Sequence, residues 1–211
     1  MKRILAIAAV ALAALLCASE INAQKFGITG GATFTSMQDI EASSKTGFNI
    51  GATAQLRLPL GFSVQPSFIY NQKSAEVGGD LVSTSMDVGY LELPVSVQWG
   101  PDLLLFRPFL DVTPFVGYAV NSTIKTEALN SLEVVTKNDW DGFSMNRFSY
   151  GLGLGGGIEV WRLQFICRYN WNFGPLFDAD GALNVQPVNE LFKDKNFGGV
   201  TLSLAFMFGR Y

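Results

Sequence analysis

Five ionisable residues are the first candidates for chemistry, because they lie on the polar side of otherwise apolar segments. They are Arg57, Glu92, Asp111, Glu159 and Arg168. Paired carboxylates can act as general acid and base in hydrolysis. Opposite charges on one face can instead form ion pairs that fill a confined interior. Which use applies depends on the elements that carry these residues.

The composition limits the chemistry further. The chain of 211 residues contains no histidine, which excludes Ser-His-Asp catalysis, His-ligated zinc and the usual general base at neutral pH. The formal net charge is −3 and the positive charges form no cluster. Nucleic-acid binding requires a basic face, so it is excluded as well.

Two short motifs resemble cofactor sites without the structural context that such sites need. Residues 151–156 read GLGLGG and match the dinucleotide fingerprint GxGxxG, but residues 158–161 (IEVW) continue a strand where a helix is required. We expect these glycines to make room for large side chains opposite. Asp178, Asp180 and Gly181 resemble part of a calcium loop, but the glycine and the glutamate that an EF-hand needs are not in place. The sequence therefore predicts no catalytic residue, cofactor or metal.

Residues 47–58 show which element carries the polar faces. Six apolar side chains, from Phe48 to Leu58, alternate without a break with Gly47, Asn49 and four further small or polar residues that end at Arg57. Such alternation is typical of a β-strand. A tilted strand needs roughly 9–11 residues to cross the hydrocarbon of a bilayer, and strands of soluble proteins usually have about 5–6. This segment is predicted to span a membrane.

The same alternation recurs and predicts eight strands. The segments are residues 24–35, 47–58, 62–71, 90–99, 107–121, 148–160, 163–173 and 200–208. Pro66, Pro94 and Pro114 fall within them and are expected to mark bulges or local breaks, because proline cannot donate to the ladder.

The connections between these segments alternate in length. Residues 59–61, 100–106 and 161–162 form short turns, whereas residues 36–45, 74–89, 122–146 and 174–196 form long polar loops. Outer-membrane barrels have short periplasmic turns and longer outward loops. The predicted fold is therefore all-β: an eight-stranded antiparallel up-and-down transmembrane β-barrel with short periplasmic turns and long extracellular loops.

Aromatic side chains are expected to form a girdle at each membrane interface, where amphipathic rings collect. The predicted interfacial residues are Phe62, Trp99, Trp161 and Phe208 near the short turns, and Tyr70, Tyr118, Tyr150 and Trp171 near the long loops. A soluble lipocalin-like lipid-binding barrel is the alternative, but it would keep its bulky apolar side chains inside.

The N-terminus predicts export. Lys2 and Arg3 precede an apolar stretch at residues 4–16, and residues 21–23 (INA) resemble a cleavage site. Residues 1–23 are predicted to be a cleaved signal peptide and residues 24–211 the barrel domain, in the outer membrane of a Gram-negative cell. A lipoprotein with Cys17 as the lipidated residue is the less favoured alternative. Cys167 is then the sole cysteine of the mature chain and is expected to face lipid.

Several motifs in these strands resemble a known family. Residues 90–94 read YLELP, residues 107–109 RPF, residues 115–118 FVGY and residues 168–170 RYN, and the last strand ends near Phe208. Together with the glycine-rich sixth segment, they resemble the PorT-like outer-membrane β-barrel family of Bacteroidetes. The resemblance implies an eight-stranded outer-membrane barrel. It implies no single activity, because most members have no assigned function and the named one assists protein secretion.

The leading hypothesis is a non-enzymatic outer-membrane barrel with a filled lumen. An eight-stranded barrel is just wide enough for its side chains to fill, so Arg57, Glu92, Asp111, Glu159 and Arg168 are expected to pair across it. The loops would serve recognition, adhesion, assembly or secretion assistance, or envelope integrity. Expected partners are outer-membrane lipid, the barrel-assembly machinery and proteins of the envelope or of secretion, without nucleic acid. The alternative from another class is an outer-membrane enzyme that uses the carboxylates of Glu92, Asp111 or Glu159.

Overall fold

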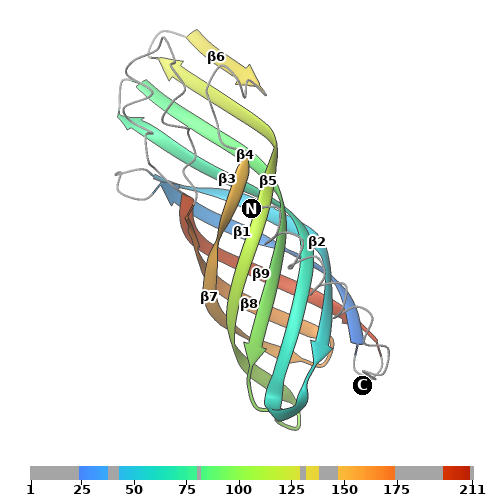
Figure 1. Cartoon of the computed structure of the whole chain (residues 1–211). Coiled ribbons are helices and arrows are strands. Elements are labelled where there is room, and N and C mark those ends of the chain that lie inside the picture. The colour runs from blue at the N-terminus through green and yellow to red at the C-terminus, as the bar shows by residue number, and fades with distance from the viewer. Residues whose placement is uncertain are drawn as a thin grey trace.

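The protein is described by a computed structural model, and nine strands are defined among the residues that it describes (Figure 1). The described residues are 24–37, 43–79, 82–128, 132–137, 147–173 and 197–209. The predicted signal peptide lies outside them. The strands are β1 (Gln24–Met37), β2 (Ser43–Arg57), β3 (Phe62–Gly79), β4 (Val82–Trp99), β5 (Phe106–Ala128), β6 (Leu132–Lys137), β7 (Phe148–Val160), β8 (Leu163–Asn172) and β9 (Phe197–Phe208).

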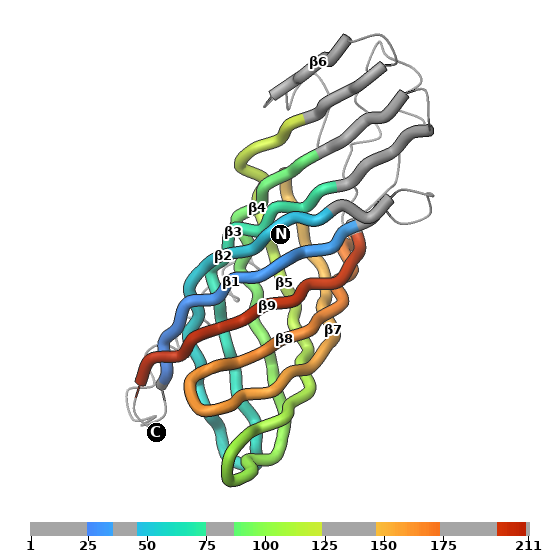
Figure 2. Tube along the Cα trace, turned by 180° about the vertical axis from the view of Figure 1, so that it is seen from behind, coloured from blue at the N-terminus to red at the C-terminus, as the bar shows by residue number. Residues whose placement is uncertain are grey.

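Eight of these strands close into a barrel. Neighbours along the sheet are β4, β3, β2, β1, β9, β8, β7 and β5 in that order, and β4 also pairs with β5 to complete the ring. Every pairing is antiparallel. The first and last strands therefore lie side by side, as Figure 2 shows for β1 and β9. The predicted eight-stranded up-and-down barrel is confirmed, and β6 adds a short ninth strand that pairs with β5 beyond the wall.

The two faces of the wall have opposite chemistry. Large apolar side chains point outward and are exposed, such as Ile28 (60%) and Leu110 (65%). Amides point inward and are fully buried, as Gln55, Gln98 and Gln164 are. A soluble lipid-binding barrel would reverse this arrangement. Among the described residues, no helix is long and apolar enough to cross a membrane.

Three short connections join strands at one end of the barrel. A single 3₁₀ turn, Pro59–Gly61, joins β2 to β3, and a two-residue turn at Trp161 and Arg162 joins β7 to β8. Leu60 and Trp161 adopt positive φ angles of 65° and 54°, which such tight reversals demand. Residues 100–105 form the third short connection, between β4 and β5.

The long connections differ from the prediction. The sequence predicts a loop at residues 74–89, but β3 and β4 stay paired through most of this segment, up to Gly79 and Val82. Much of the expected loop 122–146 is likewise strand, because β5 continues to Ala128 and pairs with β6. Strands β3 to β6 thus extend past one side of the barrel (Figure 1). The sequence-based prediction was wrong here because these segments are mostly polar. Without an alternation of hydrophobic and polar residues, a strand cannot be distinguished from a loop by its sequence pattern. The expected loop 174–196 lies outside the described residues, and the described residues of the expected loop 36–45 belong to β1 and β2.

The prolines do not shift the register. Pro114 pairs with Leu152 in β7, but its pair with Val95 in β4 is missing. Two pairs of the ladder are missing beside Pro66 and beside Pro94, but the register is the same on both sides. The expectation of bulges or local breaks is therefore confirmed for the local breaks and wrong for bulges at these positions. The register shifts occur instead near Gly89 and between Ser44 and Asn49.

Glycines in β7 make room for large side chains from neighbouring strands. A Cβ atom added at Gly151 would lie 2.5 Å from Cζ of Phe115, and one at Gly157 would lie 2.5 Å from Cζ of Phe109. At Gly153 the added atom would collide with Cδ of Arg168. The sequence motif GxGxxG is thus a packing pattern, as its strand context predicts.

Replacing such a glycine is expected to destabilise the barrel. Gly151→Ala should cost about 1–3 kcal/mol, because the new methyl group would collide with the backbone carbonyl oxygen of Trp171 and with the ring of Phe115. Gly30→Ala is the matched control, because its Cβ would meet only the Asn49 carbonyl oxygen at 3.5 Å. Urea unfolding of refolded protein in lipid vesicles, followed by tryptophan fluorescence, measures both changes. Equal midpoints for the two variants would contradict the packing role.

Candidate functional site: the charged lumen

The lumen at the short-turn end is built around the carboxylate of Glu159. Lys25 Nζ lies 2.9 Å from Glu159 Oε1, and Arg57 Nη2 lies 2.6 Å from the same oxygen. Lys25 and Arg57 come from the neighbouring strands β1 and β2, whereas Glu159 reaches them across the interior from β7. Glu159 is 3% exposed, so its charge is compensated by cations rather than by water.

Arg107 and Asp102 complete this cluster. Arg107 Nη2 donates to the Gly61 carbonyl oxygen at 2.9 Å and to Ser63 Oγ at 3.1 Å, and its Nη1 lies 3.7 Å from Glu159 Oε2. Asp102 lies in the connection between β4 and β5 and contacts Arg57 Nη1 at 2.9 Å and Arg107 Nε at 3.5 Å. Asp102 is the exposed member of this cluster, whereas Arg107 is buried.

A belt of amides separates this cluster from the next. Gln98 lies at its centre and accepts hydrogen bonds from Gln55, Gln164 and Ser63 while it donates to Gln65 at 3.0 Å. All four glutamines are buried. The four glutamines project from β2, β3, β4 and β8, so the belt links strands on opposite sides of the interior.

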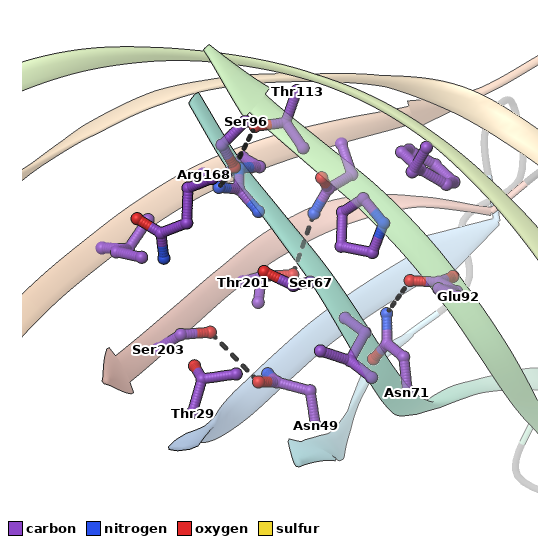
Figure 3. Close-up of a pocket in the computed structure, with 16 residues that line it drawn as sticks. Thr29, Asn49, Ser67, Asn71, Glu92, Ser96, Thr113, Arg168, Thr201 and Ser203 are labelled. Atoms are coloured by element: carbon purple, nitrogen blue, oxygen red, sulfur yellow. Dashed lines mark hydrogen bonds between the residues drawn. The ribbon is translucent and has the colours of Figure 1, made fainter. Parts of the chain in front are cut away.

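The middle cluster is a bidentate ion pair. Arg168 Nε and Nη2 lie 2.7 Å and 2.8 Å from the two carboxylate oxygens of Asp111, and Nη2 also donates to Ser96 Oγ at 2.9 Å. Thr113 Oγ1 makes hydrogen bonds with both Asp111 and Ser96. Figure 3 shows Arg168, Ser96 and Thr113 converging from three strands. Charge-assisted bidentate pairs of this kind fix orientation as well as charge.

The cluster nearest the long connections is centred on Glu92. Lys73 Nζ lies 2.7 Å from Glu92 Oε1, and Asn71 Nδ2 donates to Oε2 at 2.9 Å. The ammonium group also lies 4.9 Å from the ring centroid of Tyr90 and 5.0 Å from that of Phe115. Cation–π contact adds to the ion pair where water is excluded.

Little space remains between these clusters. The cavity at mid-lumen measures about 40 Å³ and is lined by polar side chains that include Thr29, Asn49 and Ser203 (Figure 3). That volume holds one or a few water molecules and no solute. Within the described part of the chain, the lumen is therefore packed with side chains.

All five ionisable residues proposed from the sequence point into the lumen, but they do not form one network. Arg57 and Glu159 meet at the short-turn end, Asp111 and Arg168 meet at the middle, and Glu92 pairs with Lys73. Each of these carboxylates is held by at least one cation. No group of three or more metal-ligating side chains occurs among the described residues.

Sequence reasoning missed Lys25, Lys73, Asp102 and Arg107. Strand parity could have found two of them, because Lys73 shares a face with Asn71 and Arg107 shares one with Asp111. Lys25 lies in the glycine-rich first strand, whose pattern is too weak to assign a face. Asp102 carried no such signal, because it lies in a turn and reaches the lumen only through the path of that turn.

The proposed interfacial aromatics lie where the strands approach their ends. Phe62, Trp99, Trp161, Phe208, Tyr118 and Tyr150 are exposed on the outer face, and Tyr70 and Trp171 are partly exposed there. Several stack in pairs, with ring centroids 6.5 Å apart for Phe62 and Trp99 and 4.6 Å apart for Tyr169 and Trp171. Cys167 is also exposed on this face. Asp178, Asp180 and Gly181 lie outside the described residues.

Breaking the middle pair is expected to be costly. Asp111→Asn should lower the free energy of unfolding by about 3–5 kcal/mol, because it leaves Arg168 buried without a counter-charge. The double variant Asp111→Leu with Arg168→Met should recover much of this loss. Urea unfolding in vesicles measures the cycle.

Asp102→Asn serves as the control for that experiment. Asp102 is 60% exposed, so its loss should cost less than about 1 kcal/mol. A loss of similar size at both positions would contradict the distinction between buried and exposed pairs.

Comparison with known proteins agrees with this architecture. Residues 22–178 match the model of the family described as "Outer membrane protein beta-barrel domain". A major outer membrane protein from Thermus thermophilus is 14% identical, with a TM-score of 0.51, over 88% of this chain and 100% of its own. Its likeness concerns the fold alone.

Two further solved structures are more distant. Neisserial surface protein A is 13% identical with a TM-score of 0.43, over 88% of this chain and 97% of its own. The attachment invasion locus protein of Yersinia pestis is 11% identical with a TM-score of 0.42, over 87% and 98%. No curated protein matches the sequence.

Proposed function

Because this chain belongs to the outer membrane protein beta-barrel domain family, we propose that it is a non-enzymatic barrel of the Gram-negative outer membrane. Its wall would cross the membrane with a closed lumen, and its long connections would face outward for recognition, adhesion, assembly or secretion assistance, or envelope integrity. The observation that carries the proposal is that the two faces of the wall are reversed relative to a soluble barrel. Apolar side chains cover the outside, and ion-paired polar groups fill the inside.

The outer face suits a bilayer. A ring of antiparallel strands leaves no unpaired edge in the hydrocarbon, which only helices and closed barrels achieve. Leu110, Phe68 and Ile28 are each more than half exposed on this wall. In water such a surface would aggregate, whereas in lipid it is solvated.

The extension of β3 to β6 supports a role in recognition. These strands project together beyond the long-connection end, where β5 leaves β7 after Tyr118 and continues with β4 and β6. A paired sheet holds its position better than a free loop, so it can present one surface to a partner. We propose that a partner from the cell envelope or the secretion machinery binds this extension.

The motifs in residues 90–94 and 107–109 support a narrower assignment to the PorT-like proteins of Bacteroidetes. Glu92 and Pro94 of the first motif are buried inside the barrel, and Arg107 of the second motif lies in the charged cluster around Glu159. From these motifs we propose only that the chain is related to the PorT-like proteins, and we infer no particular activity from them.

The enzyme alternative is less well supported. Glu92, Asp111 and Glu159 are each buried and held by a cation, so none is available as a general base. A nucleophilic water would also need access that the packed lumen does not offer.

The closed lumen predicts the absence of conductance. Purified protein in planar bilayers should give no stable stepwise current, whereas an open porin of about 16 strands gives one under the same conditions. Stepwise conductance from this protein would contradict the filled lumen and leave the membrane location untouched.

The orientation predicts which end is accessible from outside the cell. In a Cys167→Ser background, Thr46→Cys should react with an impermeant maleimide on intact cells, because Thr46 is exposed at the long-connection end. Leu60→Cys, exposed at the short-turn end, should react only after the outer membrane is opened. Labelling with the reverse order would contradict the proposed topology.

A further inference from the structure

A second cavity opens at the short-turn mouth of the barrel. It measures about 400 Å³ and lies between the connection 100–105, the turn at Trp161 and the cluster around Glu159. Small-molecule sites commonly measure about 300–1,000 Å³, so this cavity is large enough for a ligand. The mid-lumen cavity, in contrast, is about one tenth of this volume.

The floor of the mouth cavity has guanidinium groups with unused donors. Arg107 is 4% exposed, and its Nη1 has no hydrogen-bond acceptor. The Nε of Arg57 is buried and also has none. A buried donor without a partner is costly, and native proteins rarely keep one. Both residues line the cavity, so an anionic group that entered it would supply the missing acceptors.

The carboxylate of Asp102 already occupies part of the space that a ligand anion would take beside Arg57 and Arg107. Its carboxylate contacts both Arg57 and Arg107, yet it is 60% exposed and belongs to a turn rather than a strand. Exposed ion pairs contribute little to stability. A ligand anion can therefore displace Asp102 at small cost, while Glu159 stays in place with Lys25.

The rim of the cavity is strongly apolar. Leu104 is fully exposed and Leu105 is 83% exposed, although both lie in a turn, and Trp161 beside them is 64% exposed. All three line the cavity. Consecutive exposed leucines are unfavourable in water, so this rim suits contact with hydrocarbon. A ligand with an anionic head and an apolar chain would satisfy floor and rim at once.

We propose that the short-turn mouth binds an anionic lipid, whose phosphate or carboxylate takes the place of Asp102 on Arg57 and Arg107 while its acyl chain lies against Leu104, Leu105 and Trp161. The phosphate of a phospholipid headgroup and the carboxylate of a free fatty acid share this chemistry. The inference rests on the proposed function only for the place of the site in the cell. If the barrel has the proposed orientation, its short turns lie at the periplasmic leaflet of the outer membrane. Binding itself is a property of the mouth.

Native mass spectrometry of the protein released from a neutral detergent tests the proposal. Dodecyl phosphate is the probe for a phospholipid headgroup, and dodecanoate is the probe for a free fatty acid. Two controls each lack one part of the ligand: dodecanol has no anionic head, and inorganic phosphate has no acyl chain. We expect one bound copy of at least one chain-bearing anion, and no binding of dodecanol or inorganic phosphate. Binding of inorganic phosphate as tight as that of dodecyl phosphate would overturn the lipid assignment.

Two substitutions in the floor should act in opposite directions. Arg57→Gln should weaken binding roughly tenfold, because it removes a charged donor. Asp102→Asn should tighten it several-fold, because the internal competitor is lost, and its exposed position leaves folding intact. Arg147→Gln makes the same change of charge at the other end of the barrel and should leave binding unaltered. Unchanged affinity in both floor variants would overturn the site.

The rim provides an independent test. Leu105→Ser should weaken binding of dodecyl phosphate, whereas Leu60→Ser, an equally exposed leucine in another short turn, should not. Equal effects would mean adsorption to apolar surface rather than a site. Tighter binding of a peptide with a free C-terminal carboxylate than of either lipid probe would assign the mouth to a protein partner instead. None of these outcomes depends on conductance or on cell-surface labelling, so the site can fail while the proposed function stands.

Discussion

Closure of the hydrogen-bond ladder is the constraint on which this structure depends. The pairing of β4 with β5 closes the ring, so that every strand of the wall has two hydrogen-bonded neighbours. A barrel in lipid cannot leave backbone N–H and C=O groups unpaired, because no water is present to satisfy them. Closure with eight strands also sets the width of the interior, which is too small for a pore and too large to leave empty.

The filling of the lumen follows from that width. Side chains that face inward must be polar enough to suit their neighbours and large enough to exclude voids. Arginine and glutamine meet both demands, and the glycines of β7 allow Phe109, Phe115 and Arg168 to occupy the interior. Because a buried charge without a partner is costly, the carboxylates of Glu92, Asp111 and Glu159 are each paired with a cation.

The two ends of the barrel are built differently, and this asymmetry bears on function. The long-connection end continues as paired strands beyond the closed ring. The short-turn end closes over a charged cluster and keeps an apolar rim at Leu104, Leu105 and Trp161. The outer face of the wall between them carries mainly apolar side chains, such as Ile28, Phe68 and Leu110.

The sequence by itself determined the strands of the wall, their faces and the positions of the short turns. Alternation such as that of residues 47–58 is a local property, because successive side chains leave opposite sides of an extended backbone. It placed Arg57, Glu92, Asp111, Glu159 and Arg168 on the inner face, and strand parity would have added Lys73 and Arg107. Only the tertiary structure decided which charges meet, because pairing across a lumen depends on register and on strand order around the ring. The choice of Lys73 for Glu92, the reach of Asp102 to Arg57 and the continuation of β3 to β6 beyond the wall all depend on contacts between residues far apart in the chain. No local pattern encodes such contacts, since the same alternation is compatible with many registers.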